Sequence, residues 1–305
     1  MVFIPFNYVL NTFLCYGKIT LEVKNMNIGF SVNDTVKQRY SVRTYDSQPV
    51  KEDVKTKLLE YANSLQNPLG PKIRFQFIEK ETAPNGEKLG TYGVIKGAKL
   101  YLGATMPDEE FANEAMGYDY EQLVLYATSL GLGTCWLGGT FNRSAFAEAM
   151  EIKENEIFPI LSPVGYPANK KSVTEKVFRR FLKADGRKPW EEIFFADSFN
   201  KPLTKEMAGA YEFPLEMLRL APSATNTQPW RVVFSDNIFH FIEQRTHESR
   251  SENNVDMHRI DLGIGICHFH LAALEKGLNG HFERKIPSSL TLPPFATYIT
   301  SWIID

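Results

Sequence analysis

The feature that most constrains the fold of this 305-residue chain is a similarity between its two halves, seen when the sequence is compared with itself at an offset of 146 residues. Five identities support the comparison: Gly117 with Gly263, Leu125 with Leu271, Ala127 with Ala273, Gly131 with Gly277, and Leu132 with Leu278. A shared helix-then-strand pattern without common origin is the alternative. We favour a diverged internal duplication, because further elements follow in the same order in both halves.

Both similar stretches are predicted to be helices followed by short strands. Apolar residues recur at helical spacing over residues 120–130 and again over 264–278, which predicts one buried face on each helix. Each stretch reaches a glycine suited to a left-handed helix cap, Gly131 or Gly277. A short apolar run after each glycine fits a strand leaving the helix.

The elements before these helices also repeat. Residues 51–64 read as a helix and 73–78 as a strand with alternating apolar side chains. In the second half, residues 204–220 read as a helix that leads through a proline-bounded loop into a strand at 230–234. Alternating helices and strands predict an α+β or α/β layered body around a central sheet.

The length is sufficient for about two domains of ordinary size. We predict an N-terminal extension over residues 1–26, a first lobe over 27–200 that includes a basic connector, and a second lobe over 201–305. The connector, residues 168–190, is the expected boundary between the halves and a candidate phosphate-contacting arm.

Composition excludes several classes of function. With 34 Lys and Arg against 36 Asp and Glu, the net charge of −2 gives no overall positive field to attract nucleic acid or an anionic membrane. Three widely spaced cysteines argue against a disulfide framework and favour a reducing compartment. The apolar N-terminal run is too short to span a bilayer and has no preceding positive charge, so we expect a cytoplasmic protein.

A metal site is not expected. All six histidines lie between His240 and His281, but His268 and His270 are two residues apart and would diverge on a helix. No HExxH motif or His-x3-His spacing accompanies them.

The first motif with chemical content is Arg39-Tyr-Ser41-Val-Arg43, which follows a short helix with Asp34 as its predicted N-cap. In an extended run, Ser41 and Arg43 project to the same side, and Arg39 at the helix end can reach the same anion. Two guanidinium groups and a hydroxyl suit a phosphate monoester. The alternative is a solvated basic helix end.

The second motif is the loop over residues 221–230 (APSATNTQPW). Its two prolines stop a helix and fix an irregular loop. Ser223, Asn226 and Gln228 supply the donors and acceptors that a heteroaromatic ligand with imide edges would need.

The third motif covers residues 131–139 (GLGTCWLGG). It is not the dinucleotide-binding GxGxxG pattern, because Trp136 occupies the last glycine position, and no P-loop lysine follows. Gly138 and Gly139 would let backbone N–H groups approach a flat ligand closely. The neighbouring Cys135 is predicted to be a buried core thiol, since nothing cationic adjoins it in sequence.

Together these motifs resemble the nitroreductase family of FMN-dependent oxidoreductases, and more closely its single-chain, two-lobed members, over about residues 27–305. The resemblance implies an α+β nitroreductase-like fold with a central, mostly antiparallel sheet flanked by helices. It implies FMN contacts from Arg39, Ser41, Arg43, Leu137, Gly138, Gly139, Arg187, Pro222, Ser223, Asn226 and Gln228. In ordinary dimeric members, the Pro-Ser loop comes from the partner subunit.

The motifs are distributed unequally between the halves. Arg-x-Ser-x-Arg occurs only in the first half and the Pro-Ser loop only in the second, while residues 63–72 lack the matching serine, asparagine and tryptophan. The chain therefore resembles a dimer fused into one polypeptide with one flavin site retained. We expect one FMN per chain, in a monomeric pseudo-dimer or a homodimer.

The resemblance implies an FMN-dependent oxidoreductase that takes a hydride from NADH or NADPH and reduces a small-molecule acceptor, such as a nitroaromatic or a quinone, by a ping-pong scheme. Arg43 would stabilise negative charge on the reduced flavin, and no side chain is nominated as a catalytic acid or base. One alternative is a reductive dehalogenase with a lid over residues 79–95. Another is a flavin-binding or vestigial protein without turnover.

Overall fold

The computed structural model describes residues 28–79, 81–169, 186–247, 254–287 and 290–305. The predicted N-terminal extension and most of the predicted basic connector lie outside these residues. Within the part that is described, no helix combines the length and apolar character needed to cross a lipid bilayer.

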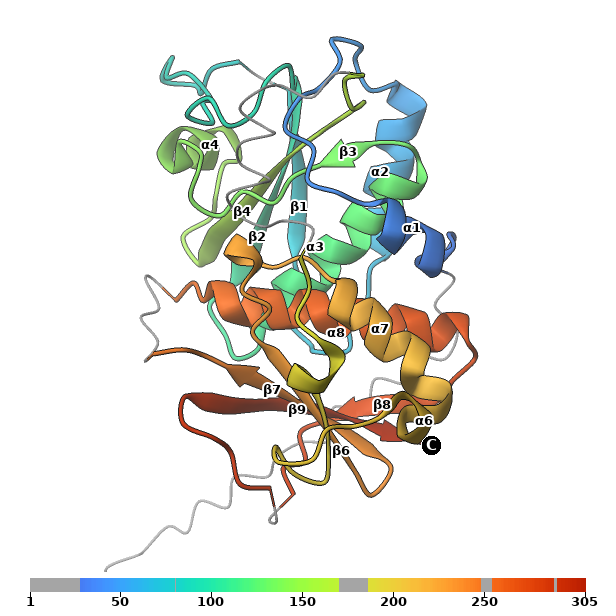
Figure 1. Ribbon diagram of the computed structural model, residues 1–305. Helices are drawn as coiled ribbons and strands as arrows, with labels where there is room; N and C mark the ends of the chain where they lie inside the picture. The colour runs from blue at the N-terminus through green and yellow to red at the C-terminus, as the bar shows by residue number, and fades with distance from the viewer. Residues whose placement is uncertain (1–27, 80, 170–185, 248–253, 288–289) are drawn as a thin grey trace, which may run out of the picture.

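The described chain forms two sheets, one in each lobe (Figure 1). The first has the order β1-β2-β4-β3 and is antiparallel throughout: β1 (Arg74–Ile78), β2 (Leu100–Pro107), β4 (Glu156–Gly165) and β3 (Gly133–Thr134). The second has the order β5-β6-β7-β9-β8: β5 (Phe194–Ala196), β6 (Trp230–Ser235), β7 (Ile238–Gln244), β9 (Ala296–Ile304) and β8 (Gly280–Glu283). The α+β class with mostly antiparallel strands is confirmed, with two sheets in place of one central sheet.

Helices surround and separate the sheets. The longer ones are α2 (Glu52–Ser64), α3 (Ala112–Ser129), α7 (Glu212–Leu220) and α8 (Met257–Glu275), and the shorter ones are α1 (Val32–Gln38), α4 (Arg143–Ala149) and α6 (Lys205–Ala208). The predicted helix over 204–220 is interrupted at Gly209, whose φ of 55° ends α6. The N-cap of α1 is Ser31 and not Asp34, because the Ser31 hydroxyl accepts a hydrogen bond from the Asp34 backbone N–H.

The two lobes share one strand order, since β1-β2-β4-β3 recurs as β6-β7-β9-β8. The additional strand β5 pairs in parallel with β6, so residues 194–196 belong to the second sheet although the predicted division at residue 200 groups them with the first lobe. The loops before β1 and β6, residues 65–73 and 221–229, are also equal in length.

Helices α3 and α8 pack against each other through the two glycines that the self-comparison aligned. A Cβ added to Gly117 would lie 1.9 Å from the carbonyl oxygen of Ile260, and one added to Gly263 would lie 1.9 Å from that of Glu114. The offset of 146 residues relates Gly117 to Gly263 and Glu114 to Ile260. Each helix therefore makes the same contact with the other, as at a two-fold symmetric interface. This geometry supports the predicted pseudo-dimeric arrangement.

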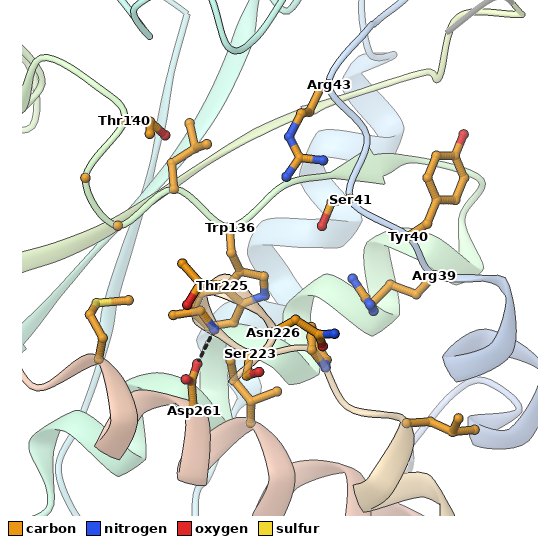
Figure 2. Close-up of a pocket in the computed structure, with 18 of the residues that line it drawn as sticks. Arg39, Tyr40, Ser41, Arg43, Trp136, Thr140, Ser223, Thr225, Asn226 and Asp261 are labelled. Atoms are coloured by element: carbon orange, nitrogen blue, oxygen red, sulfur yellow. Dashed lines mark hydrogen bonds between the residues drawn. The ribbon is translucent and has the colours of Figure 1, made fainter. Parts of the chain in front are cut away.

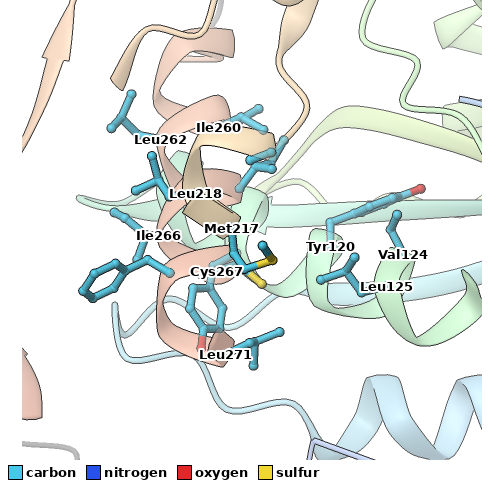
Figure 3. Close-up of a cluster of buried hydrophobic side chains, with 14 of the residues drawn as sticks. Tyr120, Val124, Leu125, Met217, Leu218, Ile260, Leu262, Ile266, Cys267 and Leu271 are labelled. Carbon is cyan, nitrogen blue, oxygen red and sulfur yellow. The ribbon is translucent and has the colours of Figure 1, made fainter. Parts of the chain in front are cut away.

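The sequence predicts one apolar face on each of these helices, but both are buried almost all round. Their position between the two lobes explains the difference. Figure 3 shows side chains of α3, α7 and α8 in one cluster that includes Tyr120, Leu125, Met217 and Cys267. One continuous core therefore joins the lobes and fixes the walls of the space between them.

Candidate functional site

A cavity of about 710 Å³ lies where the two lobes meet, and all but one of the predicted site residues line it (Figure 2). From the first lobe come Arg39, Ser41, Arg43, Leu137, Gly138 and Gly139. From the connector and second lobe come Arg187, Pro222, Ser223 and Asn226. The predicted residue outside the lining set is Gln228.

One side of the cavity is strongly basic. Arg39 is the C-cap of α1, and the chain then becomes extended, with Ser41 bridged to Thr134 and the Val42 N–H donating to the Thr134 carbonyl at 2.8 Å. In Figure 2, Ser41 lies between the side chains of Arg39 and Arg43. Lys37, in the last turn of α1, lines the same side. Guanidinium forks beside a hydroxyl form a site suited to a phosphate group.

Arg187 lines the cavity, but its guanidinium also has a structural role. Its Nε and Nη2 donate to the Leu220 carbonyl at 3.2 and 2.9 Å, and Nη1 donates to the Gly186 carbonyl at 2.8 Å. Leu220 is the last residue of α7, so Arg187 satisfies a terminal carbonyl of that helix. The sequence did not indicate this capping contact.

The loop from the second lobe has an unusual backbone. Thr225, Asn226 and Gln228 have φ values of 49°, 61° and 51°. Positive φ is especially unfavourable for a β-branched residue such as threonine, and such strain persists only where surrounding contacts enforce it. Two contacts do so here: the Ala224 N–H donates to Asp261 Oδ1 and the Gln228 N–H to Ser223 Oγ, both at 2.9 Å.

Gln228 lies behind the cavity wall, where it fastens this loop. Its side-chain oxygen accepts from the Lys188 N–H at 2.8 Å, and its Nε2 donates to the Asn226 carbonyl at 3.1 Å. The positive φ at Gln228 turns the chain so that the side chain is buried, only 3% exposed. The prediction that Gln228 contacts the cofactor is not supported by this placement.

The opposite side of the cavity is formed by the glycine segment after β3. The backbone N–H of Leu137 donates to the Leu161 carbonyl at 2.8 Å, which fixes the glycine segment to β4. A Cβ on Gly138 would lie 2.8 Å from Met257 Cε, whereas one on Gly139 would meet nothing within 4 Å. The flexible end of Met257 is therefore the group nearest to Gly138, and the space at Gly139 is open to a ligand.

Asp261 of α8 is a lining residue that the sequence reasoning missed. Burial raises the pKa of Asp261 well above its usual value, which favours the protonated carboxyl. Met257, Asp261 and Ile264 all line the cavity and follow one another at helical spacing, so an aspartate within the apolar stripe of α8 was the available signal.

The Asp261→Asn variant should remove a pH-dependent loss of stability. Because the pKa of Asp261 is raised in the folded protein, folding retains a proton that the unfolded chain releases above its ordinary pKa. This lowers the stability of the wild type by about 1.4 kcal/mol per pH unit until the folded pKa is reached. Asparagine still accepts from the Ala224 N–H, so the difference in unfolding free energy between variant and wild type should grow from pH 5 to pH 8 in denaturant titrations. A constant difference would show that Asp261 is ionised.

The structure also bears on two predictions made from the sequence, the core role of Cys135 and the lid over residues 79–95. Cys135 is buried and lies outside the set of lining residues, as expected of a core thiol. The proposed lid is anchored at a few points, although most of its described residues are exposed: Leu89 and Ile95 are buried, and the Asn142 N–H donates to the Gly90 carbonyl at 2.9 Å. Among the described residues of this segment, Val94 is the one that lines the cavity, and it has no polar group to hold a zwitterion.

Comparison with known proteins gives a consistent result. A family model described as "Putative TM nitroreductase" matches residues 31–273. A crystal structure from Thermotoga maritima MSB8, described as a "putative nitroreductase", is 18% identical, covers 93% of this chain and 98% of its own, and has a TM-score of 0.58, which shows a shared fold. A search of curated proteins gave no match.

Smaller solved structures match about half of the chain. An FMN-dependent nitroreductase from Clostridium difficile R20291 is 17% identical over 45% of this chain and 88% of its own, with a TM-score of 0.36. An oxidized iodotyrosine deiodinase bound to FMN and 3-iodo-L-tyrosine is 17% identical over 47% of this chain and 92% of its own, with a TM-score of 0.38.

Proposed function

The chain belongs to the nitroreductase family whose model matches residues 31–273, and from this premise we propose that it is an FMN-dependent oxidoreductase. Its electron donor is NADH or NADPH, and its acceptor is a nitroaromatic, a quinone or a related small molecule.

The observation that carries the proposal is a single cavity lined by motifs from both lobes. Arg39, Ser41 and Arg43 reach it from the first lobe, and Ser223 and Asn226 reach it from the second. These two motifs are far apart in the sequence and come together because the lobes pack through α3 and α8, with α1 also contacting α7 and α8. A mononucleotide with a charged tail and a flat ring system matches a cavity that is basic on one side and lined by glycine on the other.

The residues present fit FMN. Arg39, Ser41 and Arg43 would hold its phosphate and ribityl chain, and the open space at Gly139 together with the strained loop at Ser223–Asn226 would enclose its rings. When bound, FMN supplies two-electron redox chemistry by accepting and donating a hydride.

The chain's own contribution is position and electrostatics. Arg43 is only 8% exposed, so its positive charge acts in a poorly hydrated environment and favours an electron-rich ligand. The loop at residues 223–228 is already held in its strained form by Asp261 and Ser223, which lowers the cost of ordering it around a ligand. Both features favour binding and orientation.

A second site at the pseudo-symmetric position is not expected. The 146-residue offset places Arg284 and Lys285 where Gly138 and Gly139 stand in the first half. The Arg284 guanidinium lies 5.6 Å from the centre of the Phe111 ring and forms an ion pair with Glu110. Long charged side chains thus replace the glycines that leave room for a ligand.

We therefore expect the purified protein to bind about one FMN per chain and to oxidise NADH or NADPH in the presence of a nitroaromatic or quinone. Flavin absorbance per chain and the decay of nicotinamide absorbance measure these properties. Failure to bind FMN, or binding of two per chain, would contradict the proposal. Binding without turnover would favour the flavin-binding alternative.

A further inference from the structure

Three polar groups converge on Glu121, a fully buried carboxylate on α3 directly behind the cavity wall. The indole Nε1 of Trp136 donates to Oε2 at 2.8 Å, and Nε2 of His268 lies 2.9 Å from Oε1. Nε of Arg39 lies 3.7 Å from the same Oε1. Arg39 and Trp136 line the cavity, whereas Glu121 and His268 do not.

We propose that Glu121 is a positioning residue that holds the Nε edge of Arg39, so that the guanidinium presents its paired Nη groups to the anionic end of the ligand. This inference rests on the proposed function and adds to it a residue that orients Arg39 without touching the ligand.

The geometry of arginine supports this role. A guanidinium is planar and rigid, so an anion beside Nε determines where the Nη groups point. The Arg39 Nε is buried and makes no hydrogen bond within the described residues, and Glu121 is the carboxylate beside it. Figure 2 shows the Arg39 guanidinium directed toward the interior of the cavity. Fixing this long side chain in advance reduces the rotamer entropy lost when a ligand binds.

Glu121 is itself held rigidly from both lobes. Nδ1 of His268 lies 2.9 Å from the Met217 carbonyl, which can only accept, so Nδ1 carries a hydrogen. The 2.9 Å contact with His268 Nε2 fixes one carboxyl oxygen of Glu121, while the Trp136 indole donates to the other. Because His268 is on α8 and Met217 on α7, the basic wall of the first lobe is fixed to the second lobe.

A double-mutant cycle on FMN affinity tests the proposal. In Glu121→Gln, the amide can still accept from Trp136 and donate to His268, but it lacks the charge that holds Arg39. We expect the FMN dissociation constant to rise about tenfold in this variant. In an Arg39→Ala background, the same substitution should change it less than about twofold, because its effect acts through Arg39.

Glu114→Gln is the matched control. Glu114 is on the same helix, is also buried and also pairs with an arginine, Arg259, but neither residue lines the cavity. Its substitution should leave FMN affinity within about twofold of the wild type.

An equal loss of affinity for Glu121→Gln in both backgrounds, or no loss in either, would overturn the positioning role. Wild-type protein that binds no FMN would instead refute the proposed function. In that case the same cycle is measured on the unfolding of the FMN-free protein. If Glu121 contacts Arg39 as proposed, the unfolding equilibrium constant of the double variant should differ at least about threefold from the value expected for independent substitutions. Additive effects there would overturn the inference.

Discussion

Arg39→Ala is expected to raise the FMN dissociation constant by about 10- to 150-fold. A charge-assisted hydrogen bond contributes about 1.5–3 kcal/mol, and the Arg39 side chain is well shielded from water on the basic side of the cavity. Quenching of flavin fluorescence on titration measures the affinity. Unchanged binding would remove Arg39 from the site.

Arg74→Ala provides the control for the loss of an arginine. Arg74 forms a two-fold hydrogen-bonded ion pair with Glu156, joining β1 to β4, and does not line the cavity. Its pairing lowers the pKa of Glu156 to about 2, so the substitution should reduce stability at neutral pH. FMN affinity should stay at the wild-type value once the fraction folded is taken into account.

Gly263→Ala is expected to destabilise the protein by about 3 kcal/mol or more. The added Cβ would lie 1.9 Å from the Glu114 carbonyl oxygen and 2.9 Å from the Tyr118 backbone nitrogen. Because these are backbone atoms at the centre of the α3–α8 contact, neither helix can yield locally, and the lobes must separate. Chemical denaturation measures the loss of stability, and FMN binding should weaken with it because the cavity depends on this contact.

Gly265→Ala, two residues away and on a different face of α8, separates this steric effect from a general sensitivity of α8. Its Cβ would meet Trp230 Cε3 at 3.3 Å and Leu218 Cγ at 3.5 Å, contacts that small side-chain shifts can accommodate. The higher helix propensity of alanine offsets part of the cost, so the change should stay within about 1 kcal/mol. Equal destabilisation by both substitutions would contradict the proposed steric origin.

Much of the local structure follows from short-range sequence patterns. The helix predicted over 51–64 is α2, and the strand predicted over 73–78 is β1 apart from its first residue. The aligned glycines Gly117 and Gly263 mark the contact between the two central helices. These features are readable because helical periodicity, strand alternation and the absence of a side chain are local properties of the chain.

The candidate site was predictable to the extent that its residues form continuous motifs. Arg39, Ser41 and Arg43 are close in sequence, and an extended backbone places them along one wall. Asp261 and Glu121 belong to no such motif, since each is an acidic residue within a helix that is buried almost all round. Their roles depend on partners more than 30 residues away.

By itself, the sequence determined several of the helices and strands, the similarity of the two halves and the residue types available for holding an anion beside a flat ring. Only the tertiary structure decided that Gln228 supports the loop from behind, that Arg187 caps α7, and that Glu121 lies against Arg39. The physical reason is that a polar side chain satisfies its hydrogen bonds with whichever groups burial brings near it, and those groups are set by the packing of the two lobes.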